Sequence, residues 1–226
     1  MPEDRKYWDA DIETMPWDKL REIQEEKLQS LVTRAYERTA LYQRKFDAVG
    51  IKPTDIKTLD DLNKLPLTEY VEDFCNTPFG DKLAVPLDEV MEIFSTSGTI
   101  SGFTQPFCLT QREIELGQNA EVRQMWMMGV RPRDVVQTLF WSMPKTCEML
   151  GVIEMPSMAG RGNLDFQIKL AKMMNVTVLQ HLSSLALRYL ERAEEMGINI
   201  RETKLRLIIG SGEALAEAVT NRVKAE

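Results

Sequence analysis

The sequence predicts an α/β protein, in which a helical N-terminal segment, residues 1–89, precedes a partial α/β domain, residues 90–226. In the first part, apolar residues recur at three- and four-residue spacing between charged ones, which is typical of amphipathic helices. From Val90 onward, short apolar runs alternate with helical patterns, which indicates a sheet with flanking helices. We expect this sheet to be mixed and the domain that contains it to be incomplete.

The first part is predicted to be helical throughout. One amphipathic helix follows Pro16, and a second runs to Gly50. Three prolines break residues 52–79, where Thr58 and Thr68 are each suited to cap a short helical piece. The apolar stripe of the first helix comprises Leu20, Ile23, Leu28, Leu31, Val32, Ala35 and Tyr36.

The second part begins with two short strands, Val90–Phe94 and Gln105–Leu109, joined by a polar loop. Because the strands are so close in sequence, a hairpin is the expected geometry. Thr110 and Glu113 then form a capping-box pattern, which opens a helix that ends near Met128.

Strands and helices alternate over the rest of the chain. Residues 144–163 are the exception, because they are rich in methionine and show no clear period, and we expect them to be irregular. The expected strands are 134–141, 176–180 and 205–209, and the expected helices are 164–174, 184–196 and 214–224.

The composition argues against several classes of protein. A net charge of -7 disfavours binding to nucleic acid or to an anionic membrane, since both need a positive surface. Cys75, Cys108 and Cys147 are scattered and odd in number, which indicates neither a disulfide framework nor a zinc site. The N-terminus is charged where a signal peptide is apolar, and no apolar run approaches the ~20 residues of a membrane span. We therefore expect a cytoplasmic protein without a metal cluster of its own.

A run of Ser, Thr and Gly between the first two strands is the strongest candidate for a binding site. Glycine lets the backbone approach a ligand closely, and converging N–H groups and hydroxyls can cradle a phosphate without a charged side chain. The run is not a Walker loop, because Gly-Lys-Ser/Thr and the helix directly after it are missing. Taken alone, its composition also fits an ordinary polar hairpin tip. The candidate phosphate-binding residues are Ser95, Thr96, Ser97, Gly98, Thr99, Ser101 and Gly102.

A second glycine segment, residues 209–214, leads from an expected strand into an expected helix. It lies at the carboxyl edge of the expected sheet, where nucleotides bind in many α/β proteins. An ordinary strand-to-helix turn, with Ser211 or Glu213 near the cap, explains the same residues. The candidate binding residues of this segment are Ser211, Gly212, Glu213 and Ala214.

Short motifs that carry little information singly follow one another in a fixed order along the chain. They are Tyr7-Trp8, Ile12–Pro16, Tyr36–Arg38, Tyr42–Phe46, Leu59–Leu62, Leu65-Pro66, Pro78–Gly80 and Val85-Pro86, and they precede the Ser/Thr/Gly loop. In this order and spacing, they resemble the phenylacetate-CoA ligase family of the acyl-adenylate-forming superfamily. The segment at 209–214 resembles the Gly-x-Glu-Pro segment that contacts adenine in the same family.

The resemblance implies a fold and a reaction. The fold is part of the N-terminal domain of an adenylate-forming enzyme. In the reaction, a carboxylate of the aryl or phenylacetate type attacks ATP, with Mg²⁺ present, to give acyl-AMP and pyrophosphate, and the thiol of coenzyme A then displaces AMP. The resemblance assigns the loop to the phosphates and the 209–214 segment to adenine, and it suggests Trp141, His181 and Ser183 as part of an acid pocket.

Three departures from the family pattern bear on catalysis. The family loop carries a Gly-Lys pair where this chain reads Ser101-Gly102-Phe103, and no Lys or Arg occurs between Lys82 and Arg112. Residues 140–162 are shortened relative to the family's glycine-rich stretch, and their methionines fit a core at least as well as a pocket. The family's aromatic-Gly-x-Thr/Ser-Glu motif, ribose-binding aspartate and adenylation lysine are not found, so the catalytic residues are expected outside this chain.

Three hypotheses follow. In the first, the chain is the N-terminal portion of a phenylacetate-CoA-ligase-like enzyme. In the second, it is a non-catalytic module that binds a nucleotide or a partner. In the third, it binds aryl acids without nucleotide. Because a truncated sheet leaves an edge uncovered, we also expect a homo-oligomer or a completing partner chain.

Overall fold

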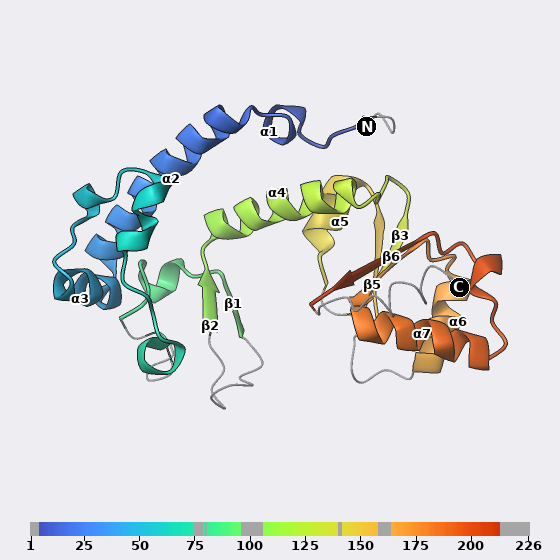
Figure 1. Cartoon of the computed structure of the whole chain (residues 1–226). Coiled ribbons are helices and arrows are strands. Elements are labelled where there is room, and N and C mark those ends of the chain that lie inside the picture. Colours follow the sequence, from blue (N-terminus) through green and yellow to red (C-terminus); the bar gives the residue numbers. More distant parts are fainter. Residues whose placement is uncertain are drawn as a thin grey trace. The chain divides into compact units, whose positions relative to one another are not determined.

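The computed structural model describes residues 5–74, 79, 81–95, 106–139, 142–157 and 164–212 of the 226-residue chain. The chain divides into two compact units (Figure 1). One unit is Thr14–Leu116, and the other joins Met1–Glu13 to Gly117–Glu226. The predicted domain boundary after residue 89 stays a prediction.

The unit Thr14–Leu116 is built on two helices, α2 (Trp17–Arg38) and α3 (Ala40–Ala48), which confirms the helices expected after Pro16 and before Gly50. Its core comprises Leu28, Val32, Phe46 and Ile56. Shorter helical turns cover 53–55, 59–64, 70–74 and 87–89. The turn at 59–64 begins with a capping box between Thr58 and Asp61, as the sequence predicts for Thr58.

A hairpin follows in the same unit. Strands β1 (Glu92–Ser95) and β2 (Pro106–Leu109) pair antiparallel, as predicted. Helix α4 (Gln111–Met127) starts directly afterwards and crosses into the second unit. The predicted capping box is present, because Glu113 Oε2 accepts from Thr110 N at 2.8 Å and Thr110 Oγ1 accepts from Glu113 N at 3.5 Å.

In its described residues, the second unit contains a parallel sheet of four strands in the order β4-β3-β5-β6. We expected one mixed sheet, but in the described part of the chain the antiparallel pair β1–β2 forms a sheet of its own. The strands are β3 (Val135–Thr138), β4 (Ile153–Pro156), β5 (Val178–Leu182) and β6 (Leu207–Ser211). The helices are α1 (Ala10–Glu13), the end of α4, α5 (Pro144–Leu150), α6 (Leu164–Met173) and α7 (Ser183–Glu195).

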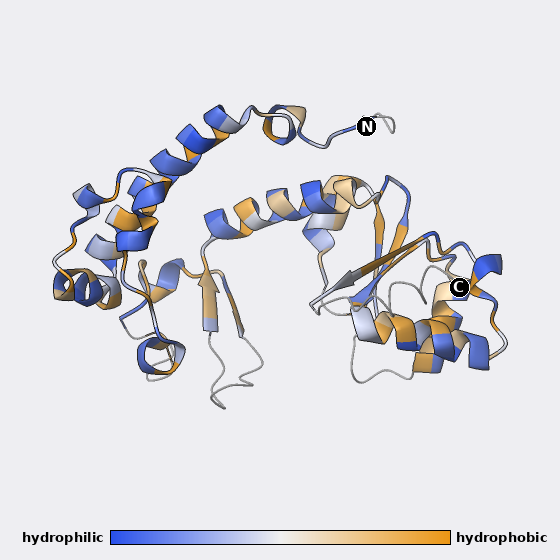
Figure 2. Ribbon diagram, in the orientation of Figure 1, coloured by the Kyte–Doolittle hydropathy of each residue, from blue (hydrophilic) through white to orange (hydrophobic). Residues whose placement is uncertain are grey.

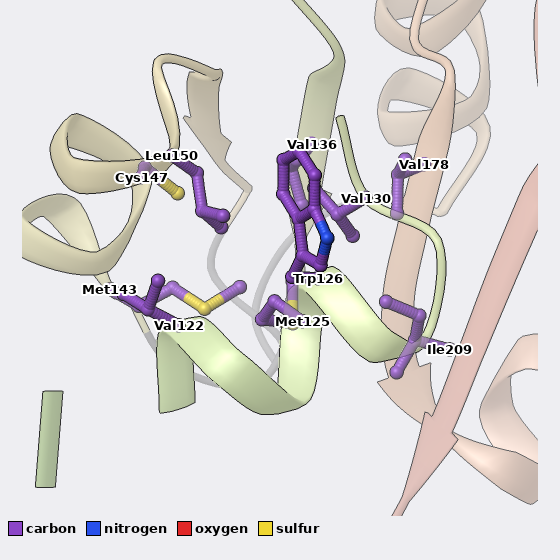
Figure 3. Packing of buried hydrophobic residues seen from close by; sticks show 10 residues of the cluster. All are labelled: Val122, Met125, Trp126, Val130, Val136, Met143, Cys147, Leu150, Val178 and Ile209. Carbon is purple, nitrogen blue, oxygen red and sulfur yellow. The ribbon is translucent and has the colours of Figure 1, made fainter. Parts of the chain in front are cut away.

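Helices cover both faces of this sheet. One face packs on α4 and α5 through a core that includes Val136 and Val178 of the strands and Trp126 of α4 (Figure 3). The opposite face packs on α6 and α7 through Leu179 and Tyr189. Side chains of consecutive strand residues point to opposite faces, so the apolar run Val178-Leu179 supplies both cores.

The prediction that residues 144–163 are irregular is wrong in its first half. Helix α5 has Pro144 at its first position and ends at Gly151, whose φ of 70° places it in the left-handed region. Proline at the start and glycine just past the end are helix signals that the methionine-rich composition obscured. Strand β4 follows at once, and its four residues are too few to show a period.

Among the residues that the structure describes, no helix is both long and apolar enough to cross a membrane. In the same residues, no group of three or more His, Cys, Asp and Glu side chains is placed to hold a metal ion.

Candidate functional site at the carboxyl edge of the parallel sheet

The sheet has a topological switch point between its two central strands, β3 and β5. The chain leaves β3 toward α5 on one face of the sheet and leaves β5 toward α7 on the other. In open α/β sheets, ligands bind outside the carboxyl ends of the strands at such a point. Thr138 ends β3 and is the register partner of Gln180 in β5, so these residues mark the place.

The carboxyl ends of β5 and β6 bring two predicted sites together. His181 is the register partner of Gly210, and Leu182 is the register partner of Ser211. His181, assigned to the acid pocket, and Ser211, assigned to the adenine segment, therefore lie on neighbouring strands at one sheet edge.

Gly212 follows β6 and has a strict requirement for glycine. Its φ is 75°, which L side chains rarely adopt, and a Cβ built at this position would lie 2.6 Å from Leu182 Cδ2. Backbone conformation and close packing both exclude a side chain here. The Leu182 side chain therefore packs directly against the backbone of the turn after β6.

Polar side chains are buried at the end of β5. His181 and Ser183 are each 5% exposed. Ser183 is the first residue of α7, whose N-terminus has no side-chain cap, and its Oγ makes no hydrogen bond with any residue that the structure describes. A buried hydroxyl without a partner is costly, and a bound ligand would satisfy it.

Glu154 is a feature of this edge that the sequence did not reveal. Its Oε1 accepts from Met143 N at 2.6 Å, at the start of α5, and from Thr138 Oγ1 at 3.3 Å. The Glu154 carboxylate, on β4, thus connects this strand to β3 and to the start of α5, the helix that lies between the two strands in the sequence. Only the pairing of β3 with β4 brings these residues together, so no local signal marks Glu154.

The structure shows the role of two of the methionines that could either fill the core or line a pocket. Met143 is buried in the core between α4 and α5 (Figure 3). Met149 is partly buried and packs against the same core. Trp141 and Met158 lie outside the described residues. For Met143 and Met149, core packing is the observed role.

The predicted phosphate loop is described only at its start. Ser95 ends β1 and is the register partner of Pro106 at the start of β2. Thr96, Ser97, Gly98, Thr99, Ser101 and Gly102 lie outside the described residues, as do Glu213 and Ala214 of the adenine segment. The assignments of these residues to ligands remain predictions.

The chain is similar to known proteins along its whole length, although no protein-family profile matches it. It is 27% identical over 224 residues to a phenylacetate-coenzyme A ligase of Thermus thermophilus, covering 96% of this chain and 49% of that protein. To the phenylacetate-coenzyme A ligase of Aromatoleum evansii it is 31% identical over 222 residues, covering 95% of this chain and 50% of that enzyme. The chain thus spans about half the length of these relatives.

A solved enzyme has the same fold. The structure of 2-hydroxyisobutyryl-CoA ligase in complex with 2-HIB-AMP and CoA, in its thioesterification state, superposes with a TM-score of 0.89 at 28% identity. The match covers 100% of this chain and 50% of that enzyme. The predicted resemblance to the phenylacetate-CoA ligases and the predicted α/β class are therefore confirmed. The chain is a homologue of the phenylacetate-CoA ligases of the acyl-adenylate-forming superfamily and corresponds to the N-terminal half of those enzymes.

Proposed function

We propose that this chain supplies the nucleotide-binding half of an ATP-dependent acid–CoA ligase. The observation that carries the proposal is that this whole chain matches half of a ligase that was solved with an acyl-AMP and CoA. At 28% identity and a TM-score of 0.89, this match involves sequence as well as fold. The sheet edge at Leu182 and Ser211 supports it, because it is where a nucleotide binds in this architecture.

In the proposed reaction, a carboxylate oxygen attacks the α-phosphorus of ATP, and the bond to pyrophosphate breaks. The sulfur of coenzyme A then attacks the acyl carbon of the acyl-AMP, and AMP leaves as the thioester forms. Alignment of the reactants and stabilisation of charge are the protein's contributions, so no covalent nucleophile is required. Residues 95–102 would hold phosphates through backbone N–H groups, and residues 211–214 would contact adenine.

Mg²⁺ enters this proposal with ATP. The described residues contain no protein cage for a metal, which fits an ion held mainly by phosphates and water. The charge that Mg²⁺ supplies would matter more here than in a loop with lysine, because residues 83–111 contain no Lys or Arg.

An aryl acid is the substrate class that we propose, with Trp141, His181 and Ser183 in its pocket. Support comes from the burial of His181 and Ser183 at the end of β5 and from the unsatisfied Ser183 Oγ. A hydrogen-bonding group on the acid would satisfy this hydroxyl.

We also propose that the active assembly contains a completing chain or a second copy. The adenylation lysine and the ribose-binding aspartate of the family are expected on a completing chain, because a second copy has the same sequence and cannot supply them. In the described part of the sheet, β6 pairs only with β5, and an edge strand of this kind can accept another strand. The acidic charge and the unpatterned cysteines favour a cytoplasmic location for this assembly.

Calorimetry with ATP, AMP and a non-hydrolysable acyl-AMP analogue tests the nucleotide proposal. We expect weak binding that is lost when Gly98 and Thr99 are replaced together by Pro and Val. Absence of heat for all three ligands at millimolar concentration in the unmodified chain would refute nucleotide binding. Ligand at 100 times its dissociation constant should also stabilise the chain by about 2.7 kcal/mol.

The missing loop lysine favours a second candidate, a non-catalytic module that binds nucleotide or a partner. Exchange of labelled pyrophosphate into ATP, measured with aryl acids on the complex purified from cells, separates the two candidates. Robust exchange excludes the module. Binding of an aryl acid with no effect of nucleotide would instead favour the acid-binding protein.

A further inference from the structure

The N-terminus of helix α7 lies at the carboxyl edge of the parallel sheet, directly after β5. Its N-cap residue is Leu182, which has no side-chain oxygen to accept from the N–H groups of the first turn. That turn contains no acidic residue either. The positive end of the helix dipole is therefore balanced neither by a capping side chain nor by a carboxylate of the helix itself.

Ser183, the first residue of α7, adds a second polar group at this end. The residue is 5% exposed, and its Oγ makes no hydrogen bond with any described residue. Because the Cα–Cβ bonds of a helix tilt toward its N-terminus, this hydroxyl projects to the same end as the first-turn N–H groups. A buried hydroxyl that needs a partner and the N–H donors of a helix start together favour a bound anion.

The rest of α7 holds this end in place and leaves it accessible. Hydrophobic and hydrophilic residues are interleaved along the helix (Figure 2), and Tyr189 and Ala193 pack with Leu179 of β5. A group on a packed helix is already ordered, which lowers the cost of binding a ligand there. Beside it, Leu182 is the register partner of Ser211, which is exposed, so the edge is open to solvent on the side of β6.

We propose that the N-terminus of α7, with the hydroxyl of Ser183, is the subsite for the carboxylate of the acid substrate. The inference rests on the proposed function and deepens it, because it states which end of the acid lies here. One carboxylate oxygen accepts from Ser183 Oγ and from N–H groups of the first turn. The register of Leu182 with Ser211 puts this subsite beside the strand end proposed for the nucleotide, where the acid has to lie to attack the α-phosphorus.

The charge of the surroundings favours a carboxylate over a phosphate. Residues 173–187 and 207–212, which form the two strand ends and the start of α7, contain no Lys or Arg. A phosphate monoester carries more charge than a carboxylate, and its sites usually include such a cation. A helix N-terminus with one hydroxyl is sufficient for a single negative charge.

Ser183→Ala separates a role in ligand binding from a role in the fold. Since Oγ bonds to no described residue, its removal leaves no partner unpaired, and stability to urea without ligand should stay the same or rise. The affinity for phenylacetate, measured by calorimetry, should fall roughly tenfold or more, as expected for a lost hydrogen bond to a charged group. Ser184→Ala is the matched control, because Ser184 is exposed in the same turn, and it should bind phenylacetate like the unmodified chain.

Phenylacetamide tests the requirement for charge. It has the ring and nearly the size of phenylacetate but is neutral, so the unmodified chain should bind it roughly tenfold more weakly or less. AMP affinity should be the same in Ser183→Ala as in the unmodified chain. Equal binding of the acid and the amide, a loss of stability in ligand-free Ser183→Ala, or a loss of AMP affinity with phenylacetate affinity retained overturns the inference.

Acetate tests the subsite without an aryl group. It should shift the backbone amide resonances of residues 183–185 more than sodium chloride does at the same concentration, and Ser183→Ala should reduce these shifts. Absence of an acetate-specific shift in the unmodified chain also overturns the inference. If that chain binds neither AMP nor phenylacetate, the proposed function fails, and the acetate titration still decides whether the N-terminus of α7 takes a carboxylate.

Discussion

Tyr189 Oη donates a hydrogen bond of 3.1 Å to Gln137 Oε1 in the core between α7 and β3. Gln137 is fully buried, and its Nε2 donates to Ser157 Oγ at 3.0 Å and to the carbonyl of Gln167 at 3.2 Å. Burial raises the pKa of Tyr189, so its hydroxyl stays protonated as a donor. These hydrogen bonds connect β3, in the centre of the sheet, to Ser157, the residue that follows β4, and to Gln167 of α6.

Tyr189→Phe leaves the buried Gln137 Oε1 without this donor. We expect a loss of about 1–3 kcal/mol in the free energy of unfolding, measured by urea denaturation. Tyr36→Phe is the control, because the hydroxyl of Tyr36 bonds to Asp47 at an exposed position and water can replace it. Similar losses for the two variants would contradict the importance of burial.

Asp134 directly precedes β3 and lies at the amino-terminal edge of the same sheet. Its carboxylate accepts from Arg206, from Thr177 Oγ1 at 2.7 Å and from Arg131 N at 2.8 Å, and its side chain is 7% exposed. Asp134→Ala should cost more stability than Arg206→Ala, because the former leaves two part-buried donors unpaired. We expect about 2–4 kcal/mol for Asp134→Ala by urea denaturation.

Glu148→Ala is the surface control for Asp134→Ala. Glu148 pairs with Lys145 at 2.9 Å, but both side chains are more than half exposed. A pair of this kind contributes about 0–1 kcal/mol. A loss for Glu148→Ala as large as that for Asp134→Ala would count against the explanation from burial.

Gly212→Ala should disturb the turn after β6, because the new Cβ meets Leu182 Cδ2 and the backbone has a positive φ. We expect weaker ATP binding together with lower stability. Gly197→Ala is the matched control, since Gly197 has a φ of 69° but its Cβ would meet no described residue beyond its chain neighbours within 4 Å. This control should show only the backbone strain, about 1–2 kcal/mol, and normal ATP binding.

Cys147 should resist alkylation in the folded chain. Burial, with the nearby carboxylates of Glu154 and Glu121 in addition, raises the pKa of this thiol to about 12. Iodoacetamide at pH 8 should label Cys147 only after unfolding, as read by peptide mass spectrometry. The raised pKa also means that its contribution to stability is complete below about pH 8.5, the ordinary thiol pKa, and is lost as pH rises toward 12.

Phe103→Lys should strengthen ATP binding, because it returns a cation to a loop that has none. A charge-assisted contact to the triphosphate should raise affinity about three- to tenfold, and the gain should shrink as salt is added. AMP affinity should change less. An equal gain for AMP and ATP would show that the lysine does not meet the outer phosphates.

The sequence by itself determined the local features of this protein. The helix after Pro16, the capping box of Thr110 with Glu113 and the alternation of strands and helices depend on residues a few positions apart. Where local signals were weak, the prediction failed, as for α5 and the four-residue strand β4. The family, too, was evident from short motifs in order.

Only the tertiary structure decided which distant residues meet. Strand register places His181 beside Gly210, and packing brings Arg206 to Asp134 and Glu154 to the start of α5. It also separated the antiparallel pair from the parallel sheet. The physical reason is that periodicity and capping are local, whereas the pairing order of strands depends on how whole faces are buried, which no single segment encodes.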